Sequence, residues 1–195
     1  MARKESETFF QKYNFKWVIL ISLWTFFLAA IFSVITESLV TNLDILIAFF
    51  VLITVISIGI LFDTIGIAVA VAQEGPFHAM AANRIKEAKH AIKLVRNASQ
   101  VSNFCNDVVG DISGIMSGAA GATIVFKITS VYPVLNSVII SIVLTAFIAS
   151  FTVGGKAFGK SVAIIHNEEI IFKIAVLLEF IENNFGIQLF KNNKK

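Results

Sequence analysis

The sequence predicts an all-α membrane protein with four transmembrane helices and, on the cytoplasmic side, amphipathic juxtamembrane helices. Of its 195 residues, 56% are hydrophobic and only 15% are charged, and the mean hydropathy is +0.81. One small soluble core could not bury that much apolar surface. The single cysteine excludes an intramolecular disulfide. A chain of this length leaves room for one domain, so residues 1–195 are expected to form a single membrane domain.

Four long apolar runs supply the predicted spans, since about 20 residues of helix cross ~30 Å of hydrocarbon. The first run, residues 18–36, has no charge, is long for the core of a signal peptide and lacks a convincing cleavage site, so it is interpreted as a retained anchor. The other runs cover residues 45–72, 103–126 and 134–158. The expected parts are a cytoplasmic N-terminus (1–16), an extra N-terminal helix (17–37), a core (45–160) and a C-terminal juxtamembrane helix with its tail (161–195).

Lys and Arg residues predict the orientation. Fifteen of the sixteen lie before residue 18, between residues 72 and 103, or from residue 156 onward, and these segments are expected on one side of the membrane. Only Lys127 lies in a connection expected on the other side. This asymmetry follows the positive-inside rule and places both termini in the cytoplasm. We expect a multi-pass protein of a bacterial inner membrane. Its expected partner is the lipid bilayer, and we do not expect it to bind nucleic acid.

Two cytoplasmic stretches look amphipathic. In residues 77–96, Ile85, Ala88, Ile92 and Val95 share one face, and the basic residues of the stretch share another. Residues 168–190 have an apolar side through Ile170, Ile174, Leu177 and Ile181. Both are interpreted as juxtamembrane packing or dimerisation helices, the first with its basic face near anionic lipid.

Three aspartates lie inside apolar runs, where an isolated one costs at least ~2.5–3.5 kcal/mol at the bilayer centre. Asp63 lies about 27 Å from the outer end of its run, and Asp107 and Asp111 lie about 6 and 12 Å from the inner end of theirs. Lys156 falls near the inner end of the fourth run. All four charges are therefore expected to meet in the cytoplasmic half of the membrane.

The third run should place its polar residues and glycines on one helix face. At 100° per residue, six positions fall within about 40° of one line: Asn103, Asp107, Asp111, Gly114, Gly118 and Gly121. Gly110, Gly114 and Gly118 recur every four residues and, with Gly121, would let another helix approach closely. Close packing alone would also explain these glycines.

Two interpretations of the acids stay open. Three acids and one Lys leave a formal charge of −2, which suits a divalent cation such as Mg²⁺. Asp63, Asp107 and Asp111 would supply charge, Thr64 and Asn103 neutral oxygen ligands, and Lys156 a counter-charge or gate. Asp63–Thr64 also interrupts the second run, as broken helices do at transporter ion sites. Alternatively, Lys156 or protonation neutralises the acids and nothing is conducted.

Residues 45–185 resemble the transmembrane domain of the cyclin-M/CorC magnesium transporters. The segment 88–97 (AKHAIKLVRN) is similar to the family's basic helix that ends in Asn, and 155–160 (GKAFGK) stands in the place of its G-E-x-x-P-K signature. The segments 63–68 (DTIGIA) and 166–169 (HNEE) occupy the places of its serine-rich S-x-S-E-T-A segment and its N-P-E-like turn. Lys156 and Gly159 replace the family's Glu and Pro.

The resemblance implies a three-helix membrane core with a belt of juxtamembrane helices, a homodimer, and an inward-facing acidic cavity that binds Mg²⁺. No nucleotide-sensing regulatory domain follows the core in the sequence, so regulation by ATP within the chain is not expected. No nucleophile–base pair is evident, so we expect neither an enzyme nor an organic cofactor.

Two functional hypotheses follow. The first is movement of a divalent cation by a homodimer, and the second is a non-conducting scaffold or regulatory subunit that acts with an unknown partner. The distances among the four charged side chains discriminate between them. Acids gathered around space for a hydrated ion, with Lys156 turned away, would favour transport. Lys156 within hydrogen-bonding distance of an acid would favour the scaffold.

Overall fold

A computed structural model describes residues 15–185, and this part of the chain is helical with no strand. Four helical segments are long and apolar enough to cross a membrane. They are α2 (Phe15–Asn42), α3 (Ile45–Val71), the continuous segment α6 (Ala98–Asn103), η1 (Phe104–Gly110) and α7 (Asp111–Val131), and α8 (Ser137–Ile165). The predicted fold class is therefore confirmed.

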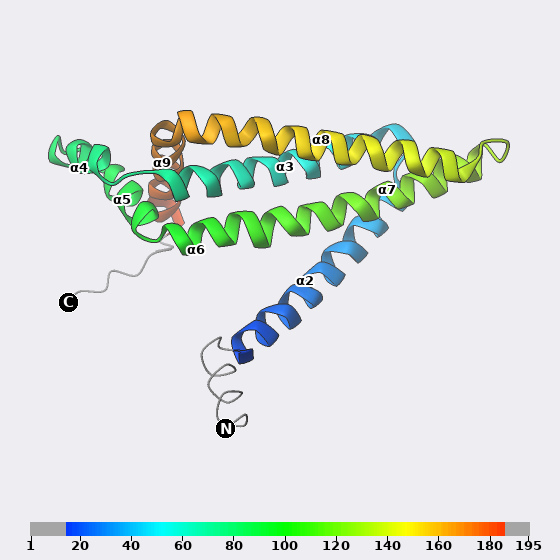
Figure 1. The fold of residues 1–195 in the computed structure, drawn as a ribbon, viewed down its shortest axis with the longest axis horizontal. Helices are drawn as coiled ribbons and strands as arrows, with labels where there is room; N and C mark the ends of the chain where they lie inside the picture. The colour runs from blue at the N-terminus through cyan, green and yellow to red at the C-terminus, as the bar shows by residue number, and fades with distance from the viewer. Residues whose placement is uncertain (1–14, 186–195) are drawn as a thin grey trace, which may run out of the picture.

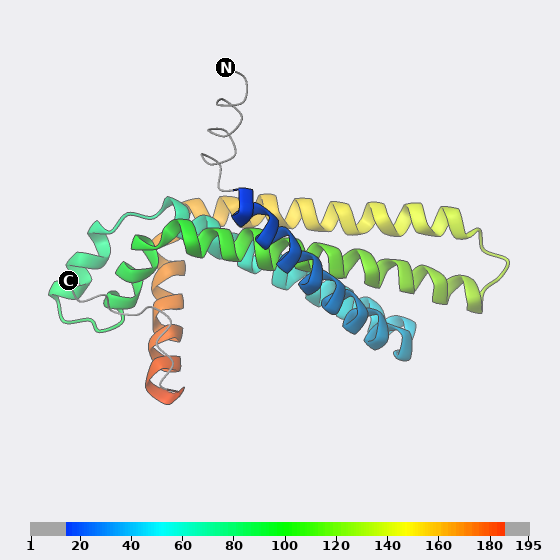
Figure 2. The same cartoon turned by 90° about the horizontal axis from the view of Figure 1, so that it is seen from below.

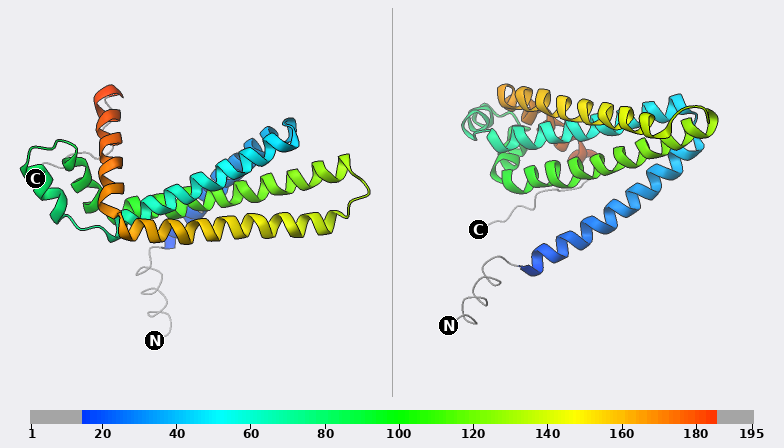
Figure 3. Two further views of the ribbon diagram at one scale, coloured as in Figure 1. Left: turned by 90° about the horizontal axis from the view of Figure 1, so that it is seen from above. Right: turned by 45° about the vertical axis from the view of Figure 1, so that its right-hand side comes forward.

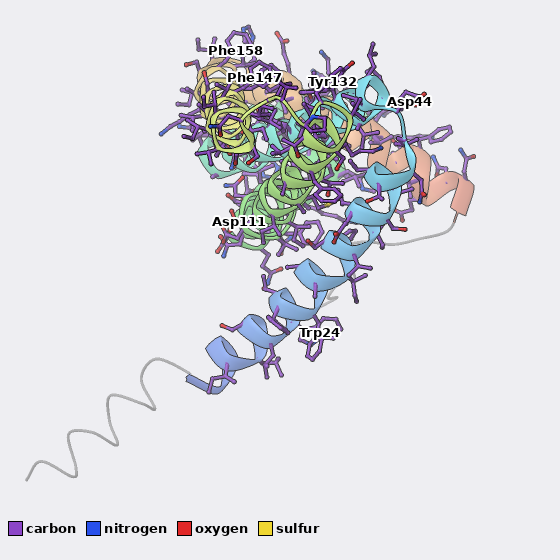
Figure 4. All side chains as sticks on the ribbon, turned by 90° about the vertical axis from the view of Figure 1, so that its right-hand side faces the viewer. Trp24, Asp44, Asp111, Tyr132, Phe147 and Phe158 are labelled. Atoms are coloured by element: carbon purple, nitrogen blue, oxygen red, sulfur yellow. The ribbon has the colours of Figure 1, made fainter. Side chains whose placement is uncertain are left out.

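Three of these segments, α3, α6–η1–α7 and α8, lie side by side as a bundle, whereas α2 diverges from it (Figure 1). Close to its C-terminal end, α2 packs on α7, where Thr36 and Val40 are buried. Val40 joins the core of the bundle, whose other buried members are Ala48, Leu52, Ile56, Ala120, Ile124 and Leu144. Figure 4 views the molecule from this end and shows Trp24 on the part of α2 that has left the bundle.

Short helices gather at the opposite end of the bundle. They are α4 (Gly75–Ala82), α5 (Ala88–Arg96) and α9 (Asn167–Phe185), and α9 runs across the direction of α8 (Figures 2 and 3). A second core holds this end together. Its buried residues are Val69, Phe77, Ala91, Ile92, Leu94, Ile171 and Ala175.

The two amphipathic predictions are correct in type and differ in detail. Residues 77–96 form two helices, because Arg84 adopts a left-handed conformation (φ 63°) between them. Ala88 and Ile92 are buried as expected, while Lys86 and Lys89 are exposed. In α9 the inward face is centred on Ile171 and Ala175, and the predicted apolar residue Leu177 is 52% exposed.

The expected N-terminal segment 1–16 lies almost wholly outside the described residues, as do residues 186–190 of the C-terminal amphipathic stretch.

Candidate functional site

Two of the predicted charges meet inside the bundle. Lys156 on α8 places its Nζ 3.3 Å from Oδ1 of Asp63 on α3. Asp63 is largely sequestered, with 15% of its side chain exposed, whereas Lys156 is 33% exposed. A lone carboxylate is expensive within an apolar span, so the nearby ammonium is a direct means of stabilising it.

Small residues make this approach of the helices possible. A Cβ built on Gly110 of η1 would lie 3.7 Å from both Asp63 Oδ1 and Lys156 Nζ, so this glycine lies directly against the ion pair. A Cβ on Gly159 of α8 would collide with Thr64, and one on Gly155 would collide with Ile60. In lipid, no hydrophobic driving force brings helices together, so transmembrane helices associate through close packing of this kind.

The space beside the ion pair is very small. A cavity of about 10 Å³ lies between α3, α7 and α8 and is lined by Gly110, Ser113, Ser117, Thr152 and Lys156, among others. That volume is about the minimum needed by one water molecule. Mg²⁺ binds proteins with several waters retained, so a hydrated ion does not fit there.

The remaining predicted acids do not join the pair. Asp107 and Asp111 are exposed, as is Asn103, and Figure 4 places Asp111 at the margin of the bundle. Among the described residues, no three His, Cys, Asp or Glu side chains lie close enough to hold one metal ion. The expectation that all four charges meet is therefore wrong for the single chain. The cause is that η1 and α7 turn small residues inward and Asp107 and Asp111 outward.

The predicted face of polar residues and glycines, which runs along α6, η1 and α7, also points outward. Asn103, Asp107, Asp111, Gly114 and Gly118 do share one face, but that face is exposed, and a Cβ on Gly114 or Gly118 would meet nothing within 4 Å. Gly110 and Gly121 are the two predicted packing glycines that contact neighbouring helices. The buried residues of this segment include Gly110, Ile112, Ser113, Ser117, Ala120, Gly121 and Ile124.

The break in helical geometry does not lie in α3 at Asp63–Thr64, as predicted, but in the segment that packs against α3. α3 is continuous through Asp63 and Thr64, and the Thr64 hydroxyl donates to the Ile60 carbonyl at 2.7 Å, so no backbone group is freed there. Instead, residues 104–110 form the π-helix η1. Single π-helical turns within α-helices recur at functional sites.

Sequence reasoning did not identify Asn106. Its Nδ2 donates to Ser102 Oγ at 3.2 Å, while its Oδ1 is buried without a hydrogen-bond partner and faces Gly66, one turn along α3 from Asp63. Its only sequence signal is a polar side chain within an apolar run, and helical periodicity places it off the face that Asn103, Asp107 and Asp111 share.

At the other end, polar side chains connect the short helices. Glu74 accepts hydrogen bonds from Arg96 Nε (2.9 Å) and from His78 Nε2 (3.0 Å). These bonds, the one from His78 first, hold the pKa of Glu74 below its usual value. The half-buried His90 on α5 lies 3.5 Å from Glu182 on α9 and so links these two helices.

Lys127, the basic residue expected on the outer side, has a structural role. Its Nζ donates to the carbonyl of Val40 at 3.0 Å and to that of Leu43. Both carbonyls belong to the C-terminal end of α2 and the following turn, where a positive charge is favourable, and the Val40 carbonyl also accepts the Leu43 N–H at 3.3 Å. Lys127 thus fastens α2 to α7.

No protein-family model, curated protein or solved structure matched the chain when it was compared with each.

Proposed function

We propose that the chain is a multi-pass membrane protein that does not conduct cations by itself, and that it acts as a membrane scaffold or regulatory subunit. The observation that supports this is the 3.3 Å contact between Lys156 Nζ and Asp63 Oδ1, in which the lysine provides the counter-charge that a bound cation would otherwise supply. The adjacent cavity of about 10 Å³ also leaves no space for a hydrated ion.

Reconstituted full-length protein tests the proposal. Proteoliposomes with an internal Mg²⁺ dye should take up Mg²⁺ no faster than empty liposomes, and Mg²⁺ should not change the thermal unfolding midpoint. Uptake clearly above that of empty liposomes would contradict the proposal.

A double-mutant cycle tests the ion pair itself. Lys156→Met and Asp63→Asn should each lower the free energy of unfolding by about 1–2 kcal/mol, which is less than the cost of breaking a fully buried pair because Lys156 is partly exposed. The double variant should lose less free energy of unfolding than the two single losses added together, because it leaves no unpaired charge in the bundle. Lys160→Met, four residues further along α8 at an exposed position, is the matched control.

A second candidate is Mg²⁺ binding or movement by a homodimer, as the family resemblance implies. One specific observation favours it: Asn106 Oδ1 is a buried oxygen without a partner on the helix that faces Asp63. In this case Lys156 would be a gate. Lys156→Met should then increase Mg²⁺ uptake, and Asp107→Asn combined with Asp111→Asn should abolish it. Unchanged uptake in that double variant would remove these two acids from the mechanism.

A further inference from the structure

A groove between α2 and α7 lies far from the Asp63–Lys156 pair, at the end of the bundle that holds the α2–α3 and α7–α8 connections. Its volume is about 610 Å³, the size of a small-ligand site. Glu37 and Thr41 line it from α2, and Thr123, Lys127 and Ser130 line it from α7. The groove therefore combines a carboxylate, a lysine side chain and several hydroxyl groups with an otherwise apolar lining.

The carboxylate in this groove is available to a ligand. Glu37 is exposed and forms no ion pair with any residue in the range 15–185 that the structure describes. Lys127, which lines the same groove, directs its ammonium to the carbonyls of Val40 and Leu43 instead. Because Lys127 is held by these carbonyls, Glu37 keeps no paired cation among the described residues, and a positively charged group of a ligand would supply one.

The hydroxyl groups of the groove are acceptors. Thr123 Oγ1 donates its proton to the Ala119 carbonyl at 3.1 Å, and Ser130 Oγ donates to the Phe126 carbonyl at 2.8 Å. Their oxygen lone pairs remain free. Together with the Glu37 carboxylate they match a group with several N–H donors, as a primary ammonium has and a quaternary ammonium lacks.

The rest of the groove is apolar and open. Ala119 and Ala122 leave it wide, and Phe126 and Val131 are 72% and 59% exposed. A ligand with an ammonium head and a hydrocarbon body would use both parts of the surface. Lipids with a primary amine headgroup have this chemistry, and their headgroups lie at the depth of a helix end.

We propose that the groove between α2 and α7 binds the ammonium headgroup of an aminophospholipid, with Glu37 as the charged contact and an acyl chain along Ala119, Ala122 and Phe126. In the orientation predicted from the Lys and Arg residues, this lipid belongs to the outer leaflet. The site does not depend on whether the chain conducts ions.

The test uses the full-length protein in detergent and three short-chain probes: dihexanoyl phosphatidylethanolamine, phosphatidylcholine and phosphatidylglycerol. Binding is measured as lipid adducts by native mass spectrometry and as the shift in unfolding midpoint. The wild type should bind the ethanolamine lipid about tenfold more tightly than the other two, the difference expected from one charge-assisted hydrogen bond. Glu37→Gln should bring it to the level of the choline lipid, whereas Glu168→Gln, an exposed change on α9, should not.

Three results would overturn the proposal. One is equal binding of the ethanolamine lipid by the wild type and Glu37→Gln. Another is equal binding of the three lipids by the wild type, a measurement that needs no variant to fold. The third is displacement of the lipid by free ethanolamine at the same concentration, which would identify a site for soluble amines.

Discussion

At the scale of single residues, the closeness of α3 and α8 depends on Gly159. Its Cβ position is occupied by the Thr64 side chain, whose hydroxyl is already bonded to the Ile60 carbonyl. Gly159→Ala should therefore lower the free energy of unfolding by about 1–3 kcal/mol, because either the helices separate or Thr64 loses its hydrogen bond.

Gly154→Ala on the same helix provides the control. Nothing lies within 4 Å of its Cβ position, so the change should be neutral or stabilising by up to about 1 kcal/mol through helix propensity. Denaturant titration in mixed micelles measures both variants. Equal losses would show that the contact with Thr64 does not control the packing.

The sequence predicted which residues of the site are charged but not which of them meet. Asp63 and Lys156 could be placed at one depth from their positions in the apolar runs, and they are in contact. The partners of Asp107 and Asp111 could not be predicted, because rotation of α7 about its axis is decided by which small residues pack best. Hydropathy does not show whether Gly114 or Ser113 should face the other helices, and in the structure Ser113 is the buried one.

At the scale of elements, α2 is held to the bundle near one end only. Lys127→Met should lower the free energy of unfolding by about 1–3 kcal/mol, since two carbonyls at the end of α2 lose a charged donor. The thermal midpoint in detergent measures this loss. Lys160→Met, which removes an exposed Lys from α8, should change the midpoint little, and a similar fall in both would indicate a general effect of charge.

The contact between α4 and α5 should depend on acid pH. The pKa of Glu74 is lowered by its bonds to His78 and Arg96, so its contribution to stability is complete above its usual pKa and disappears as the pH falls through the lowered value. The unfolding midpoint of the wild type should fall more steeply below pH 4.5 than that of Glu74→Gln. Parallel curves for the two proteins would contradict this, and Glu168→Gln is the control.

At the scale of the whole molecule, the basic residues should define the cytoplasmic end. Single cysteines introduced in a Cys105→Ala background test this, because that background removes the one native cysteine. A membrane-impermeant maleimide should label Asn136→Cys, between α7 and α8, in intact cells. It should label Lys86→Cys, between α4 and α5, only after permeabilisation. The reverse pattern would invert the orientation.

The helical class and the four spans could be read from the sequence because hydrocarbon thickness fixes the length of an apolar run. The split of residues 77–96 could not be predicted, since it depends on one backbone conformation at Arg84. The π-helix was equally invisible, because it changes no hydropathy pattern and is defined only by its hydrogen bonds.

The position of α2 also has a mechanical consequence. From Thr36 to its first residue, this helix extends about 32 Å beyond the place where it is fastened. It is therefore a lever arm that pivots beside Thr36, and a tilt of about 10° at the pivot would displace its far tip by about 6 Å. A load on that tip would act on the contacts beside the pivot, where the groove that contains Glu37 lies.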